Sequence, residues 1–156
     1  MEELTAALAG SDFAQYLRHG RWSYAAVNAA HILGIALLVG SVAVLDLRLF
    51  GVWKAIPLDH LARPLVPVAA GGLILAMAAG LLLFAVRAPE YAAMPIFAAK
   101  LALIAIGTAS AISHHLVHGR SLDRASPAML RLAGATSLLC WTGALLLGRL
   151  LAFAGD

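Results

Sequence analysis

Four long stretches of the chain are almost wholly apolar: residues 25–45, 65–86, 95–112 and 132–148. His31 and Lys100 are the ionisable side chains within them. A helix needs about 20 mostly apolar residues to cross a hydrocarbon core about 30 Å thick. With their flanks, the stretches therefore predict membrane-spanning helices at roughly residues 24–48, 64–87, 94–118 and 128–152.

Proline, serine and glycine positions indicate where these helices begin and end. Proline is tolerated in a first helical turn, because its missing N–H would have no partner there. Prolines lie where the later helices are expected to begin, at Pro64, Pro67, Pro95 and Pro127. Ser126 is suited to cap the fourth helix. Gly51 and Gly119 lie where the first and third helices are expected to end.

The connections between the predicted spans are short, so neighbouring helices should be antiparallel. The expected fold is therefore all-α, an integral membrane four-helix bundle of up-down-up-down topology. Residues 22–156 would form the transmembrane domain, and residues 1–21 an N-terminal interfacial segment. Apolar side chains recur among polar ones over residues 3–17, which favours a short helix at the membrane surface, with a flexible tail as the alternative.

Composition excludes most other classes of protein. Of the 156 residues, 62% are hydrophobic and 12% are charged, whereas a soluble domain carries about 25% charged residues. A single cysteine, Cys140, excludes a disulfide scaffold. The formal charge of +3 gives no indication of nucleic-acid binding. The sequence has no Gly-rich phosphate loop and no CxxC motif.

Basic residues near the spans indicate the orientation in the membrane. The loops at residues 46–64 and 119–131 carry six of them: Arg48, Lys54, Arg63, Arg120, Arg124 and Arg131. The side with both termini carries four: Arg18, Arg21, Arg87 and Arg149. This bias predicts a multi-pass protein of the bacterial inner (cytoplasmic) membrane, with both termini in the periplasm.

Four residues with metal- or anion-binding side chains are predicted to converge in the half of the bundle nearest the termini: His31, Met77, Arg87 and Lys100. Haem iron takes a neutral imidazole as axial ligand, with Met or another donor opposite, and its propionates attract Arg or Lys. The pattern predicts a b-type haem with His31 as ligand, Met77 or Lys100 opposite, and Arg87 on a propionate. Simpler interpretations are a hydrogen-bonding histidine, a packing methionine and a lysine that reaches the headgroups.

A second group of ionisable residues lies toward the opposite side of the membrane. His114 and His118 are four apart on the third predicted helix and share a face, so they are candidates for a transition metal or a second haem. Histidines in a last helical turn also favour the helix dipole without any ligand. Asp46 and Arg48 are two residues apart, so they should not face each other.

Several runs between Trp22 and His118 carry a family resemblance: residues 31–40 (HILGIALLVG), 46–51 (DLRLFG), 80–84 (GLLLF), Tyr91 and residues 97–101 (FAAKL). With these runs the chain resembles an uncharacterised family of small four-helix bacterial membrane proteins. More distantly, it is similar to the membrane domain of copper-resistance protein D and to HemJ-type protoporphyrinogen oxidase, a four-helix haem-binding protein. The resemblance matches His31 to the oxidase's essential His and Lys100-Leu101 to its Lys-Leu, with Arg87 as the candidate for its essential Arg. It implies haem binding but does not carry over the reaction.

The leading hypothesis is a b-type membrane cytochrome that transfers electrons between a quinone or a partner redox protein and another acceptor. It would act as an oxidoreductase or as a redox subunit of one. A copper- or metal-handling protein is the first alternative, with His31, Met77, Cys140 and the histidines near residue 114 as ligands. The second alternative is a cofactor-free structural subunit of a larger membrane complex, or a homo-oligomer, packed through stripes of small residues.

Overall fold

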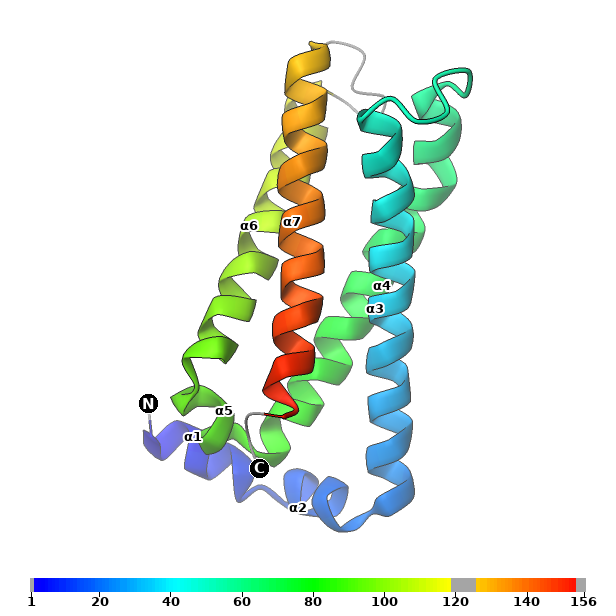
Figure 1. Cartoon of the computed structure of the whole chain (residues 1–156). Coiled ribbons are helices and arrows are strands. Elements are labelled where there is room, and N and C mark those ends of the chain that lie inside the picture. Colours follow the sequence, from blue (N-terminus) through cyan, green and yellow to red (C-terminus); the bar gives the residue numbers. More distant parts are fainter. Residues whose placement is uncertain (1, 119–125, 154–156) are drawn as a thin grey trace.

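Every structural element in the described part of the chain is a helix (Figure 1). The computed structural model describes residues 2–118 and 126–153. The long helices are α3 (Arg21–Leu49), α4 (Leu58–Val86), α6 (Pro95–His118) and α7 (Pro127–Leu151). The short helices are α1 (Glu2–Ala9), α2 (Asp12–His19) and α5 (Ala88–Ala93). The all-α prediction is confirmed.

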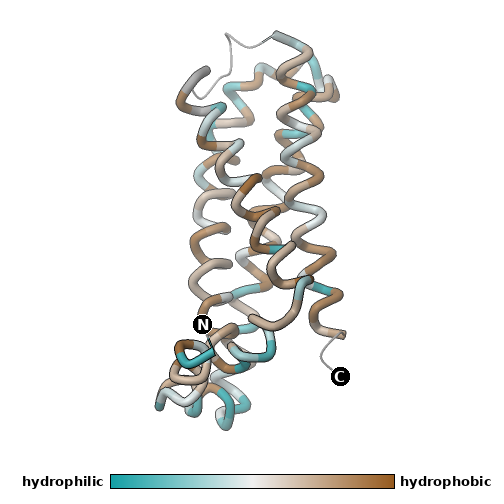
Figure 2. Tube along the Cα trace, turned by 90° about the vertical axis from the view of Figure 1, so that its left-hand side faces the viewer, coloured by the Kyte–Doolittle hydropathy of each residue, from teal (hydrophilic) through white to brown (hydrophobic). Residues whose placement is uncertain are grey.

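The long helices α3, α4, α6 and α7 are each long and apolar enough to cross a membrane. Their ends lie within three residues of the predicted ones, except at the start of α4. Helices α3 and α6 end, and α4 and α7 begin, at one end of the molecule, and α1, α2 and α5 lie at the other (Figure 1). Hydrophilic residues gather in the short helices beside the N-terminus (Figure 2).

The long helices pack in the order α4, α3, α7, α6. Helix α3 contacts α4 and α7, and α7 contacts α6. Between the described residues of α4 and α6, no Cα atoms lie within 8 Å of each other. Helices α4 and α6 are therefore more widely separated than the helix pairs in contact, and we call the side of the bundle between them the open side.

Two glycines bring α3 and α4 together. A Cβ atom on Gly34 would lie 2.5 Å from the backbone nitrogen of Ala76, and one on Gly72 would lie 2.7 Å from that of Leu38. Such distances are far below van der Waals contact, so only glycine allows this separation of the two backbones. The close packing fixes the side chains of α3 relative to those of α4.

Most predicted helix ends are confirmed. Helix α3 ends just before Gly51, whose φ of 98° suits a residue without a side chain. Pro95 is the first residue of α6. The Ser126 hydroxyl accepts a hydrogen bond of 3.3 Å from the Met129 backbone N–H at the start of α7. The predicted end at Gly119 lies outside the described residues.

The predicted start of the second long helix is wrong. Helix α4 begins at Leu58, after Pro57, so Pro64 and Pro67 lie inside the helix and not in its first turn. The additional turns are polar, and they are stabilised by a hydrogen-bonded ion pair of 2.8 Å between Asp59 and Arg63. A prediction based on the apolar run alone could not include them. The two prolines leave carbonyl groups of the preceding turns without their usual helical donors.

The N-terminal segment contains two helices where the sequence predicts one. They separate at Gly10, and the Ser11 hydroxyl accepts a hydrogen bond from the Ala14 N–H at the start of α2. Ala14 and Leu17 are almost fully buried, at 0% and 2% exposure. The Arg18 guanidinium donates a hydrogen bond to the backbone carbonyl of Val86 at the end of α4. These contacts attach α2 to the bundle.

Candidate functional site

Two hollows lie inside the bundle, one in each half of its length. We call them the His31 hollow, of about 230 Å³, and the Asp46 hollow, of about 440 Å³. Side chains of α3, α4, α6 and α7 line both. Three residues line both and separate them: Leu38, Leu73 and Trp141. Of the predicted haem residues, His31, Met77 and Lys100 line the first hollow, and His114 lines the second.

The imidazole of His31 is held by a neighbouring helix. Its Nδ1 lies 2.8 Å from the backbone carbonyl oxygen of Ala76 on α4. A carbonyl can only accept, so Nδ1 carries the proton and Nε2 keeps its lone pair in the neutral ring. A Cβ on Gly80 would lie 3.0 Å from Cε1 of His31, so the ring needs this glycine. Metal-binding histidines are commonly oriented in this way, through the nitrogen that does not bind the metal.

Met77 and Lys100 line the same hollow as His31. Met77 follows Ala76 on α4, and Lys100 extends from α6 over Gly148 of α7, where a Cβ would lie 3.6 Å from Nζ. No carboxylate in the described part of the chain forms an ion pair with Lys100. The hollow thus brings together an imidazole, a thioether and an unpaired amine, as the sequence predicts.

Arg87 is not among the residues that line the His31 hollow. It caps the end of α4, and its Nε lies 2.5 Å from Oε2 of Glu90 on α5. Both side chains are about half exposed, so this pair contributes little to stability. A propionate bound by Arg87 would share its guanidinium with Glu90, because the ion pair uses Nε and the two terminal nitrogens carry further donors. Lys100 is the cation that the structure places in the hollow.

Aromatic residues close the end of the His31 hollow nearest the short helices. The rings of Phe84 and Phe97 line it and stack 5.1 Å apart, joining α4 to α6. Tyr91 of α5 stacks on Phe97 from the other side, with centroids 6.0 Å apart. Burial, with smaller effects of Tyr24 and Glu90, raises the pKa of Tyr91 above its usual value, against the opposing charge of Arg87. The phenol is therefore neutral near pH 7.

The donor set fits a b-type haem, and the volume fits it in part. An imidazole with a free Nε2, the Met77 thioether and the Lys100 cation line one apolar space. At about 230 Å³, that space is below the 300–1,000 Å³ typical of sites that enclose a ligand. Leu81 and Leu101 line it but are 62% and 43% exposed. A macrocycle would therefore extend past these two side chains toward the open side between α4 and α6.

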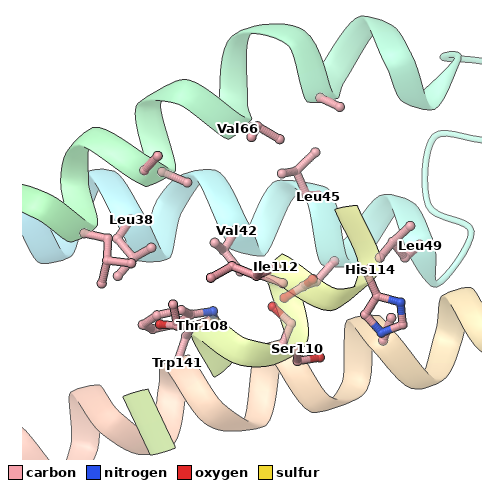
Figure 3. A pocket seen from close by; sticks show the side chains of 18 of the residues that line it. Leu38, Val42, Leu45, Leu49, Val66, Thr108, Ser110, Ile112, His114 and Trp141 are labelled. Atoms are coloured by element: carbon pink, nitrogen blue, oxygen red, sulfur yellow. The ribbon is translucent and has the colours of Figure 1, made fainter. Parts of the chain in front are cut away.

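Asp46 lines the second hollow and does not pair with Arg48. Arg48 hydrogen-bonds to the backbone carbonyls of Ile56 and Lys54 and not to Asp46, so the expectation that these two do not face each other is confirmed. Asp46 is 3% exposed and lines the hollow with His114. Figure 3 shows His114 and Leu49 at one end of the hollow and Leu38 at the other.

Of the two histidines predicted as a metal site, His114 and His118, the structure describes the side chain of His114 alone. His114 lines the Asp46 hollow, whereas the side chain of His118 lies outside the part that the structure describes. Among the described residues, no three His, Cys, Asp or Glu side chains form a group that could hold a metal. Cys140 is buried against Gly107 of α6 and lines neither hollow. Of the ligands in the copper hypothesis, His31 and Met77 therefore line the same hollow, and Cys140 does not.

Comparison with known proteins identifies the family of the chain. A model of a family of unknown function (DUF6644) matches residues 9–154, and the protein belongs to this family. No curated protein and no solved structure matches the chain. The resemblance to HemJ-type protoporphyrinogen oxidase and to copper-resistance protein D therefore stays a prediction.

Proposed function

We propose that this member of the DUF6644 family is a b-type membrane cytochrome, with haem in the His31 hollow and Nε2 of His31 as an axial ligand. The observation that carries the proposal is the 2.8 Å hydrogen bond between Nδ1 of His31 and the Ala76 carbonyl. This bond selects the tautomer that a metal requires and fixes the plane of the ring. Gly80 leaves room for the ring beside α4.

The remaining ligands follow from what else lines the hollow. Met77 and Lys100 are the candidates for the second axial position. The one of these that does not bind iron has another role: Lys100 would pair with a propionate, and Met77 would pack against the macrocycle. Arg87 can bind a second propionate through its terminal nitrogens while its Nε stays on Glu90.

Bound haem would supply one-electron oxidation and reduction. The chain would hold the iron through His31 and surround the ring with apolar side chains, which keep water away and affect the reduction potential. A quinone in the bilayer or a partner redox protein would exchange electrons with it. The protein would then be an electron-transfer subunit or a small oxidoreductase.

The proposal places the chain in a bacterial inner membrane. Helices α3, α4, α6 and α7 would cross it in up-down-up-down order, and α1 and α2 would lie at the periplasmic surface. Support comes from the four long apolar helices and from the excess of basic residues in the loops at residues 46–64 and 119–131. Both termini would be periplasmic.

An absorption spectrum tests the haem site. Protein produced with ample haem and purified in detergent should show a sharp Soret band, and split visible bands after reduction with dithionite. Loss of an outer partner of a metal ligand costs about 10–100-fold in affinity, so His31→Ala should lower haem content by at least about tenfold. His60→Ala is the control, because His60 is exposed at the start of α4.

Exogenous imidazole separates ligand loss from misfolding. It should restore the pigment to His31→Gly, since the substitution leaves a space for a free imidazole. An unchanged spectrum in His31→Ala would overturn the assignment of the ligand. Colourless wild-type protein that contains copper would instead favour a copper site formed by His31 and Met77.

A further inference from the structure

We propose that the Asp46 hollow binds the ring of a lipid-soluble quinol or quinone, hydrogen-bonded to Oδ2 of Asp46. A role for this ligand as electron donor or acceptor rests on the proposed haem, but its binding does not. The site is distinct from the His31 hollow, although Leu38, Leu73 and Trp141 line both.

The first argument is an unsatisfied carboxyl oxygen. Asp46 is buried, with 3% of its surface exposed, and its Oδ2 has no hydrogen-bond partner among the described residues. Ser137 faces the same carboxyl group from α7. Buried polar groups are rarely left unpaired, because this costs roughly 1–3 kcal/mol. A ligand hydroxyl would donate to the carboxylate, and a protonated carboxyl would donate to a ligand carbonyl, so both states of a quinone ring can bind.

The second argument is the distribution of polar groups along the hollow. The polar side chains of the lining include Asp46, Ser110, His114 and Ser137. Figure 3 shows His114 at the end near Leu49, and Asp46 is three residues before Leu49 on α3. Toward Leu38, apolar side chains of α3 and α4 line it. Its volume of about 440 Å³ lies within the 300–1,000 Å³ of typical small-molecule sites. The space thus matches a ligand with a polar ring and an apolar substituent.

The third argument is access from the lipid. The Cα atoms of the described parts of α4 and α6 stay more than 8 Å apart, and the Phe84–Phe97 stack that joins the two helices lines the other hollow. Ile112 and Leu116 of α6 line the hollow but are 54% and 81% exposed. A ligand dissolved in the bilayer can therefore enter sideways between the helices.

Charge selects a neutral ligand over an anionic one. Within the part of the chain that the structure describes, no lysine or arginine lines the hollow. A fatty acid or a lipid phosphate would place a negative charge beside Asp46 with no cation to offset it. A quinol is neutral and has donors and acceptors on opposite sides of its ring, which suits a carboxyl group and an imidazole on different helices. A lipophilic amine is the competing ligand that the experiment must distinguish.

The experiment measures binding of a decyl-substituted benzoquinone and its quinol to the full-length protein in detergent by titration calorimetry. Asp46→Leu keeps a similar side-chain volume but removes the hydrogen bond, so the affinity for the quinone should fall about tenfold or more. Asp46→Asn keeps hydrogen-bonding atoms, so its affinity for the quinone should fall less. Ala70→Phe should block binding by filling the hollow, because Ala70 lines it, whereas Ala78→Phe, exposed on α4 and outside both hollows, should not.

The outcomes also separate this inference from the proposed haem site. His31→Ala should lose its pigment and still bind the quinone with wild-type affinity. Thermal unfolding curves show whether Asp46→Leu and Ala70→Phe are folded. If both folded variants bind the quinone with wild-type affinity, the inference is overturned. It is also overturned if dodecylamine binds in an Asp46-dependent manner and neither quinone form does, since the site would then select a cation.

Discussion

The orientation of His31 depends on Gly80 and on one backbone carbonyl. Nδ1 binds the Ala76 carbonyl, and the ring edge lies where a side chain at position 80 would begin. Neither contact is visible in the sequence, which contains only a histidine on one apolar stretch and a glycine on another. The structure therefore adds a reason why His31 can be a ligand, and that reason can be tested without replacing His31.

We expect Gly80→Ala to lower haem content or change the spectrum of bound haem. The new Cβ would lie 3.0 Å from Cε1 and 3.3 Å from Nδ1 of His31, so the ring must rotate or its hydrogen bond must lengthen. By analogy with other outer partners, the loss in affinity is about tenfold. The haem-to-protein ratio and the Soret position measure it. Gly40→Ala, which meets nothing within 4 Å, is the control and should match wild type. Equal spectra for both variants would contradict the role of Gly80.

The second axial ligand can be identified by two substitutions of similar volume. Met77→Leu removes the thioether and Lys100→Leu removes the amine without adding a new donor, and both side chains line the His31 hollow. If one of them binds iron, its replacement should convert a six-coordinate low-spin haem to a high-spin one, as measured by electron paramagnetic resonance. The other variant should keep the low-spin signal. Low-spin signals in both would show that neither is the ligand.

At the scale of elements, the α3–α4 pair is the best-defined unit of the bundle. Gly34 and Gly72 let the two backbones meet, and Gly34 lies at the level of the His31 hollow, between its lining residues His31 and Ile35. Helices α4 and α6, in contrast, are joined by the Phe84–Phe97 stack near their connected ends. Backbone contact therefore fixes α3 against α4, whereas ring stacking holds α4 beside α6.

We expect Gly72→Ala to destabilise the protein and the neighbouring Gly71→Ala not to do so. A Cβ at position 72 would lie 2.8 Å from the Gly34 carbonyl oxygen, whereas one at position 71 meets nothing within 4 Å. Overpacking of this kind costs roughly 1–3 kcal/mol, and Ala in place of an unconstrained helical Gly contributes about 1 kcal/mol of stability. In detergent, the unfolding temperature of Gly72→Ala should therefore fall below that of wild type, and that of Gly71→Ala should rise above it. Similar unfolding temperatures would show that α3 and α4 can separate without cost.

At the scale of the whole molecule, the ends of the bundle differ in chemistry. The end with the termini holds α1, α2 and α5, and the hydrogen bond from Arg18 to the Val86 carbonyl ties two of its segments together. At the opposite end α3 and α6 end and α4 and α7 begin, and the sequence carries more basic residues in the segments that follow α3 and α6. This asymmetry is the basis for the predicted orientation.

Reporter fusions test that orientation. An enzyme that is active only in the periplasm should be active when fused after residue 156 and inactive when inserted in the loop at residue 55. Six basic residues against four give only a small bias, so a double substitution, Arg48→Gln with Lys54→Gln, should produce a mixed population. Activity at the loop and none at the C-terminus would reverse the assignment.

Hydrophobic pattern alone was sufficient to predict the number, type and most ends of the long helices. A run of apolar residues of membrane length requires a helix, because its backbone must satisfy its own hydrogen bonds in lipid. Pattern could not place the start of α4, since its first turns are polar and are stabilised by the Asp59–Arg63 pair. The break between α1 and α2 at Gly10 was likewise not predicted.

Helical spacing and depth also predicted that His31, Met77 and Lys100 would share one space, because their depths depend only on rise per residue and helix direction. They could not separate Arg87 from that group, because the end of α4 and the ion pair with Glu90 decide where its guanidinium lies. Only the tertiary structure decided the tautomer of His31, the open side between α4 and α6, and the unpaired oxygen of Asp46. Each depends on how one helix lies against another, and that distance is not encoded in the pattern of any single helix.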